Sequence, residues 1–162
     1  MNTQDGMNIQ DGMNTQDGMK LALELAADCA KISSDVPVGA VILNKAGQVL
    51  ATGVNERELR GDPTAHAEIV AIRKAAEALG SWRLDEHTLI VTLEPCAMCA
   101  GAIAQARIQK LVFGAWDEKA GAVGSLWDLL RDPRALHKVE VTAGLLGAES
   151  AHLLREFFMR QR

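Results

Sequence analysis

The sequence TLIVTLEPCAMCAGAIAQAR, residues 88–107, joins a short apolar run directly to a segment of helical character. The run at 88–93 has the length and apolar character of a strand buried between two layers. The next segment is predicted to be a helix that begins at Pro95 or Cys96 and ends near Arg107. A buried strand followed by a helix is the repeating unit of an α/β fold.

The same alternation continues in both directions along the chain. Asn44 and Gly47 suit a hairpin turn between two strands, and Asp62 followed by Pro63 suits a helix start. The predicted helices are 19–31, 62–79, 95–107, 125–131 and 148–162, and the predicted strands are 38–43, 48–54, 88–93, 110–114 and 138–142. This pattern predicts a three-layer α/β/α sandwich around a mixed five-stranded central sheet.

Length and composition favour one globular domain. The chain has 162 residues, of which 48% are hydrophobic, and no apolar run approaches the roughly 20 residues of a membrane helix. The first residues lack the basic start and apolar stretch of a secretory signal. We therefore expect a protein without a membrane partner, located in the cytoplasm.

The N-terminus consists of a six-residue unit repeated three times, MNTQDG, MNIQDG and MNTQDG. This polar segment, residues 1–18, is predicted to be a disordered tail, which leaves 19–162 as the folded domain. The tail holds three Asp and no Lys or Arg, so the folded part is nearly neutral although the whole chain carries −4. A nucleic-acid partner would therefore have to bind a local basic patch.

Three residues in two short motifs form a candidate zinc site. Cys96 and Cys99 are three positions apart and share one face of a helix, so they can reach a single ion. His66 lies at another predicted helix start, and first-turn side chains from two helices can converge on a metal between them. The positive ends of both helix dipoles favour thiolates. The third cysteine, Cys29, fits a small buried packing residue.

Glu68 is a carboxylate that the zinc site does not need as a ligand. A structural zinc usually has four protein ligands, whereas three leave a position open for water, whose pKa the metal lowers. Glu68 can accept the proton of that water and pass it to the substrate and then to a departing amine. The chemistry predicted from these residues is hydrolytic loss of ammonia.

The two motifs together resemble the H-x-E…P-C-x-x-C signature of zinc-dependent nucleoside and nucleobase deaminases. Longer stretches are similar to the bacterial tRNA-specific adenosine deaminases, and this resemblance extends from about Met19 to the C-terminus. These stretches are Val36–Val41, Asp62–Ile72, Thr92–Ile103, Val112–Ala115 and Gly121–Leu126.

The resemblance implies a cytidine deaminase-like fold and a homodimer with one Zn²⁺ per subunit that converts the wobble adenosine of a tRNA anticodon stem-loop to inosine. Glu68 would protonate N1 of adenine and then the leaving ammonia. Asn55 matches a residue that contacts the base, and Asp117 matches an acid close to the ribose. Phe157 and Phe158 lie in a closing helix that approaches the anticodon loop in this family.

Two other functions remain open from the sequence. One is a deaminase of a free base or nucleoside, of the guanine or cytosine type, and the other is a zinc-stabilised binding protein without turnover. Phe157 and Phe158 form an apolar stripe with Leu153 and Leu154, and for one of the two phenylalanines core packing is at least as good an interpretation. Trp116 lies in a predicted loop and receives no role.

Overall fold

The computed structural model describes residues 12–161 and contains a five-stranded sheet in the order β2-β1-β3-β4-β5. The strands are β1 (Gly39–Leu43), β2 (Val49–Val54), β3 (Thr88–Leu93), β4 (Lys110–Ala115) and β5 (Glu140–Ala143). Strand β1 is antiparallel to β2 and β3, whereas β3, β4 and β5 run parallel to one another. The predicted mixed sheet is confirmed.

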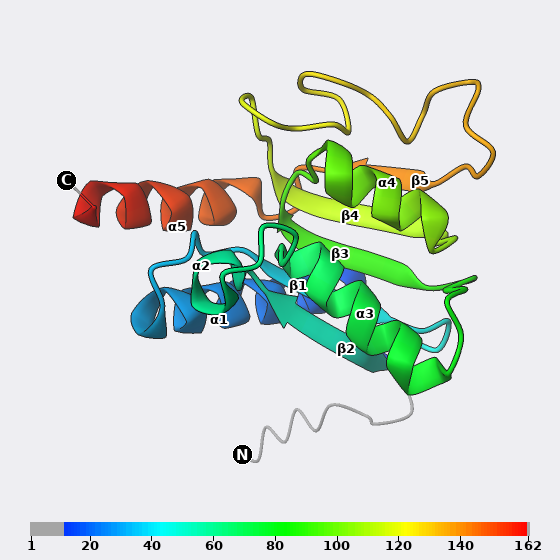
Figure 1. Ribbon diagram of the computed structural model, residues 1–162, viewed down its shortest axis with the longest axis horizontal. Coiled ribbons are helices and arrows are strands. Elements are labelled where there is room, and N and C mark those ends of the chain that lie inside the picture. Colours follow the sequence, from blue (N-terminus) through cyan, green and yellow to red (C-terminus); the bar gives the residue numbers. More distant parts are fainter. Residues whose placement is uncertain (1–11, 162) are drawn as a thin grey trace, which may run out of the picture.

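Helices cover both faces of the sheet, as Figure 1 shows. Helices α1 (Thr15–Ile32) and α5 (Gly147–Arg160) pack on one face, and α3 (Ala67–Leu79) and α4 (Ala97–Gln105) lie on the other. Consecutive residues of the strands point to opposite faces, so the three central strands β1, β3 and β4 each contribute to two cores. Ala40, Ile42, Leu89, Val91, Leu111 and Phe113 face α3 and α4, while Val41, Leu43, Ile90 and Val112 face α1.

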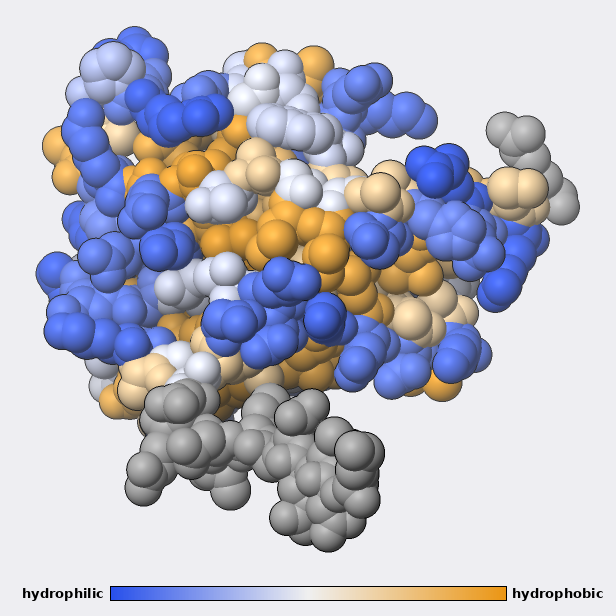
Figure 2. Space-filling model, turned by 180° about the vertical axis from the view of Figure 1, so that it is seen from behind, coloured by the Kyte–Doolittle hydropathy of each residue, from blue (hydrophilic) through white to orange (hydrophobic). Residues whose placement is uncertain are grey.

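The face that carries α1 and α5 keeps visible hydrophobic surface among hydrophilic side chains (Figure 2). Partly buried leucines of α1 and of the turn before α5 pack against the core on this side. Cys29 of α1 is buried, in agreement with its predicted packing role. Among residues 12–161, no helix is both long and apolar enough to cross a membrane.

The strand directions bring three chain segments to one end of the sheet. Because β2 and β3 are both antiparallel to β1, they run in the same direction, and β4 is parallel to β3. The carboxyl ends of β2, β3 and β4 therefore lie at the same end. A short helix, α2 (Arg57–Arg60), and the start of α3 follow β2, the start of α4 follows β3, and a long loop follows β4.

Helix α3 lies unusually close to β2. A Cβ atom at Gly53 of β2 would collide with the backbone of Ala67 and Ala71. Glycine at this position lets the first turn of α3 rest directly on the sheet. The close contact fixes where the N-terminus of α3 points.

Helix α1 begins earlier than the sequence predicted. Asn14 is its N-cap and accepts a hydrogen bond from the amide of Asp17 at 2.8 Å. Gly18 is buried against Ile90 and Leu43 of the sheet. The third copy of the repeat therefore belongs to the folded domain, and the boundary expected at residue 18 was wrong. The disorder predicted for residues 1–11 concerns a segment outside the described residues.

Helix α3 begins at Ala67, not at Asp62. The Asp62 carboxylate caps a tight turn by accepting hydrogen bonds from the amide and the hydroxyl of Thr64, at 2.9 and 2.8 Å. The N-cap of α3 is His66. The predicted capping chemistry of Asp62 is present, but it serves the turn that leads into the helix.

The helix predicted at 125–131 is wrong, because this segment is a series of turns. Its backbone amides donate to groups outside the segment. The amide of Leu126 donates to the carbonyl of Gly121, and the amide of Ser125 donates to the side chain of Glu94. Because these amides donate outside the segment, they cannot form the hydrogen bonds of a helix, and the segment remains part of the loop after β4.

Candidate active site

Three candidate zinc ligands converge at the end of the sheet. His66 is the N-cap of α3, Cys96 is the N-cap of α4, and Cys99 lies in the first turn of α4. The Nδ1 atom of His66 lies 3.6 Å from Sγ of Cys96 and 3.5 Å from Sγ of Cys99. Two helix N-termini thus face one point, as the sequence pattern suggested.

The separations fit a tetrahedral zinc ion. With Zn–N and Zn–S bonds of about 2.0 and 2.3 Å, tetrahedral angles place the nitrogen and sulfur about 3.5 Å apart. The three donor atoms lie within 4.8 Å of one another, and within residues 12–161 no further His, Cys, Asp or Glu joins this group. One imidazole and two thiolates are ordinary zinc donors, and three protein ligands leave a fourth position for water.

The three ligands share protons when no metal is bound. A hydrogen bond from Cys99 lowers the pKa of Cys96 to about 4, and His66 contributes in the same direction. The same hydrogen bond, together with burial, raises the pKa of Cys99. The hydrogen bond with Cys96 raises the pKa of His66. A metal ion must displace these shared protons when it binds.

Glu68 is buried in the first turn of α3, next to the zinc ligands, and it is not part of the ligand group. Burial raises the pKa of Glu68, although Cys99 and His66 act in the opposite direction. A raised pKa makes the carboxylate a stronger base than an ordinary glutamate and lets the carboxyl group hold a proton for transfer. This is the property required of a general acid and base.

A pocket of about 220 Å³ opens onto these groups. It is smaller than the 300–1,000 Å³ typical of sites for drug-sized ligands, and it suits a compact planar group such as one base. Its walls combine apolar and polar side chains. They are Val36, Val38, Asn55, Arg57, His66, Ala67, Glu68, Leu93, Glu94, Cys96, Asp117 and Ala120.

Asn55 follows β2 and lines this pocket. Its Nδ2 donates to the carbonyl of Val36 at 3.1 Å, and its Oδ1 accepts from the amide of Arg57 at 3.2 Å. These bonds fix the orientation of the amide and leave one N–H donor and one lone pair for a ligand. The side chain is therefore a rigid polar contact on the pocket wall.

Asp117 follows β4 and also lines the pocket. Its Oδ1 accepts hydrogen bonds from the amides of Lys119 and Ala120, at 3.0 and 3.2 Å. Within the described part of the chain, its Oδ2 takes no hydrogen bond. One carboxylate oxygen orients the side chain, and the other is available to a ligand.

Phe157 and Phe158 lie outside this pocket. They pack edge to face, with ring centroids 5.3 Å apart, near the C-terminal end of α5. Phe157 is partly buried beside Ala30 and Ser33 of the α1 region, and Phe158 is 53% exposed. The two rings are therefore not among the pocket residues that could contact a bound base directly.

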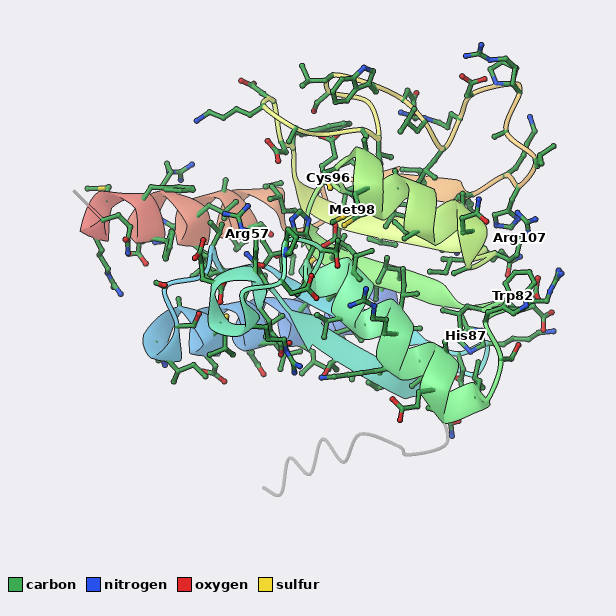
Figure 3. All side chains as sticks on the ribbon, in the orientation of Figure 1. Arg57, Trp82, His87, Cys96, Met98 and Arg107 are labelled. Carbon is green, nitrogen blue, oxygen red and sulfur yellow. The ribbon has the colours of Figure 1, made fainter. Side chains whose placement is uncertain are left out.

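Two pocket residues received no role in the sequence analysis. Arg57 extends from α2 on the same side as Cys96 and Met98, whereas Trp82, His87 and Arg107 lie at the opposite end of the sheet (Figure 3). Arg57 could not be identified from sequence because α2 has only four residues.

Glu94 is the second such residue, and it is 2% exposed. Burial would raise its pKa, but hydrogen bonds from Ser125, Asp117 and Val123 outweigh burial and hold the pKa below its ordinary value. An acid placed between a buried strand and Pro95-Cys96 was the available sequence signal.

Comparison with known proteins identifies relatives of the whole folded domain. The cytidine and deoxycytidylate deaminase zinc-binding region matches residues 13–115. The tRNA-specific adenosine deaminase of Haemophilus influenzae is 47% identical over 143 residues, which cover 88% of this chain and 82% of the relative.

Solved structures show the same similarity. A structure from a study of A-to-I editing by tRNA:A34 deaminases at the wobble position of transfer RNA has a TM-score of 0.80 and 46% identity, and the match covers 84% of this chain and 97% of that one. A guanine deaminase from Bacillus subtilis has a TM-score of 0.64 and 33% identity, with 93% and 96% covered.

Proposed function

This chain belongs to the tRNA-specific adenosine deaminases within the cytidine and deoxycytidylate deaminase family, and on that premise we propose that it converts the wobble adenosine of a tRNA anticodon to inosine. The reaction adds water at C6 of adenine and breaks the bond between C6 and the exocyclic nitrogen, which leaves as ammonia. The observation that carries this proposal is the pocket in which Glu68 lies beside three zinc ligands.

His66, Cys96 and Cys99 would hold the zinc ion. When bound, zinc supplies Lewis-acid activation of the water that reacts with the base. Glu68 accepts the proton that this water loses and delivers a proton to N1 of the adenine. Glu68 then takes the second proton of the added water, from the hydroxyl now on C6, and delivers it to the departing amine, so that one carboxyl group serves in turn as base and as acid.

Asn55 and Asp117 orient the nucleotide. The free donor and acceptor of Asn55 suit the edge of a purine ring, and Oδ2 of Asp117 suits a ribose hydroxyl. Val36, Val38 and Leu93 supply apolar contacts to the faces of the base. Because the target base must leave the stacked anticodon loop to enter this pocket, the substrate presents it from a single-stranded loop.

A free base is the second candidate substrate, because guanine deaminases share the fold at lower identity. An RNA substrate is supported by the higher identity to tRNA-specific relatives and by Arg57, a cation at the pocket wall where a phosphate could lie. A protein that acts on tRNA would work in the cytoplasm. Phe158, which is exposed on α5, remains a candidate for stacking on an unpaired base of the loop.

The proposal includes a homodimer. Four large side chains of the segment after β4 are between 40% and 54% exposed, and we call them the apolar patch: Trp116, Leu126, Trp127 and Leu129. Large apolar side chains exposed on one loop are a candidate interaction site. A second copy of this chain is the partner that the family resemblance implies.

The substrate assignment can be tested with the purified zinc form. It should produce inosine from an anticodon stem-loop that carries a wobble adenosine, measured by mass analysis of the nucleosides. The same loop with guanosine at that position is the control and should remain unchanged. Ammonia release from free guanine, cytosine or adenosine, without inosine formation in the loop, would contradict the proposal.

A further inference from the structure

The loop that carries Asp117 is held by one buried side chain. Glu94 directly follows β3, and its carboxylate accepts hydrogen bonds from the amides of Asp117, Val123 and Ser125 at 3.0, 3.0 and 3.1 Å. It also accepts from the hydroxyl of Ser125. A single acid thus ties Asp117, at the beginning of the loop, to Val123 and Ser125 further along it.

The carboxylate lies directly against the backbone of the loop. A Cβ atom at Gly121 would overlap the carboxylate of Glu94, so only glycine allows this approach. The loop is also paired with the segment after Glu94, because Gly121 forms a bridge with Cys96 and the amide of Ala122 donates to the carbonyl of Pro95 at 2.8 Å. Glu94 is therefore enclosed by the loop it binds.

The two oxygens of Glu94 have different partners. Oε1 accepts from the amide of Asp117 and from the hydroxyl of Ser125, whereas Oε2 accepts from the amides of Val123 and Ser125. The link to Asp117 is made by Oε1 alone. It fixes the backbone of Asp117, whose side chain is in turn oriented by the amides of Lys119 and Ala120.

We propose that Glu94 is a positioning residue that acts through Asp117: its carboxylate holds the loop so that Oδ2 of Asp117 faces the nucleotide pocket. This inference rests on the proposed function, because Asp117 contributes to catalysis only if it binds the substrate. Glu94 acts through the loop and not on the reacting atoms themselves. Its loss should weaken substrate binding more than it slows the chemical step.

The substitution Glu94→Gln separates the hydrogen bond to Asp117 from the hydrogen bonds to Val123 and Ser125. The new amide group can take the position of Oε1, because the hydroxyl of Ser125 can accept a hydrogen bond as well as donate one. The remaining oxygen then keeps the amides of Val123 and Ser125. The amide of Asp117 alone loses its acceptor. The variant therefore releases the loop at Asp117 but still holds it at Val123 and Ser125.

Kinetics on the anticodon stem-loop should show this release. We expect Glu94→Gln to raise KM about tenfold, the effect of one hydrogen bond to a charged group, with kcat within about twofold of the wild type and zinc content unchanged. Asp117→Ala should also raise KM, and adding Glu94→Gln to it should have no further effect. Glu86→Gln, at an exposed acid paired with Lys45, is the matched control and should change neither parameter.

Amide hydrogen exchange of the zinc form provides a readout that does not depend on activity. In Glu94→Gln, the amide of Asp117 should exchange faster, while those of Val123 and Ser125 keep their protection. Unchanged exchange at Asp117, an unchanged KM, additive effects in the double variant or loss of zinc would each overturn the role assigned to Glu94. If the wild type forms no inosine in the stem-loop, the proposed function fails, whereas the exchange measurement still decides whether Glu94 holds the loop.

Discussion

In the proposed reaction, Glu68 accepts a proton at one stage and donates it at the next. Its burial in the first turn of α3 raises its pKa, which brings the two protonation states closer in free energy near neutral pH. The neighbouring ligands were predictable because His-x-Glu and Cys-x-x-Cys each place side chains within reach of one point. The position of Glu94 before Pro95-Cys96 was a sequence signal, but its role was not predictable, since its partners include backbone amides of a loop 23 to 31 residues later.

Replacing Glu68 by glutamine should separate catalysis from metal binding. Glu68→Gln keeps the size of the side chain but cannot carry a proton, so inosine formation should fall by about 10²–10⁴-fold while zinc content stays the same. Nucleoside mass analysis and metal analysis measure the two quantities. Glu77→Gln, on an exposed position of the same helix, is the control. Normal activity in Glu68→Gln would remove this residue from the mechanism.

Zinc affinity should decrease as the pH is lowered. The hydrogen bond with Cys96 raises the pKa of His66, and the pKa of Cys99 is raised by Cys96 and by burial, so both groups hold protons that zinc must displace. Linkage then predicts about a tenfold loss of affinity for each proton displaced per pH unit. Competition with a chromophoric chelator between about pH 8 and about pH 6 measures this slope. An affinity independent of pH would show that the metal-free site holds no displaceable proton.

Helix α2 has only four residues, and a distant acid supplies its N-terminal hydrogen bonds. Asp35 is 1% exposed and accepts hydrogen bonds from the amides of Glu58 and Leu59 at 2.6 and 3.1 Å. Its position in the segment after α1 gave no sequence signal for this role, because the pairing joins residues more than twenty positions apart. The regular helices and strands could be predicted because their apolar residues recur with a fixed period.

Asp35→Asn should destabilise the fold at neutral pH. Burial would raise the pKa of Asp35, but hydrogen bonds from Ser33, Glu58 and Leu59 outweigh it and lower the pKa below the ordinary value. A depressed pKa means that the carboxylate stabilises the folded state above its unfolded pKa, and that this stabilisation is lost as the pH falls through the folded pKa.

Urea unfolding measures this contribution. At about pH 7 we expect Asp35→Asn to reduce the free energy of unfolding by about 1–3 kcal/mol, because two backbone amides lose their charged acceptor. The difference should shrink below about pH 4, where the wild-type carboxyl group also becomes protonated. Asp28→Asn, at an exposed acid paired with Lys31, should change stability little at either pH. A difference that stays constant with pH would mean that Asp35 acts through shape and not through charge.

The candidate site lies at one end of the sheet, where α3 and α4 begin, and the loop that carries the apolar patch leaves β4 at the same end (Figure 1). The loop between β4 and β5 supplies both Asp117 and the patch, and Glu94 ties its first part to the zinc ligands. A partner that binds the apolar patch would therefore contact the same loop that supplies Asp117 to the pocket. This arrangement makes the assembly state relevant to the nucleotide site.

Trp127→Asp should convert the protein from dimer to monomer, because a charge at the patch would have to be buried against a second copy. Sedimentation velocity measures the change, which should appear as a halved mass with an unaltered circular dichroism spectrum. Trp82→Asp is the matched control, since Trp82 is 60% exposed but lies at the opposite end of the sheet, and this variant should remain dimeric. If Trp127→Asp stays dimeric, or if the wild type is a monomer at micromolar concentration, the patch serves a partner other than a second copy of this chain.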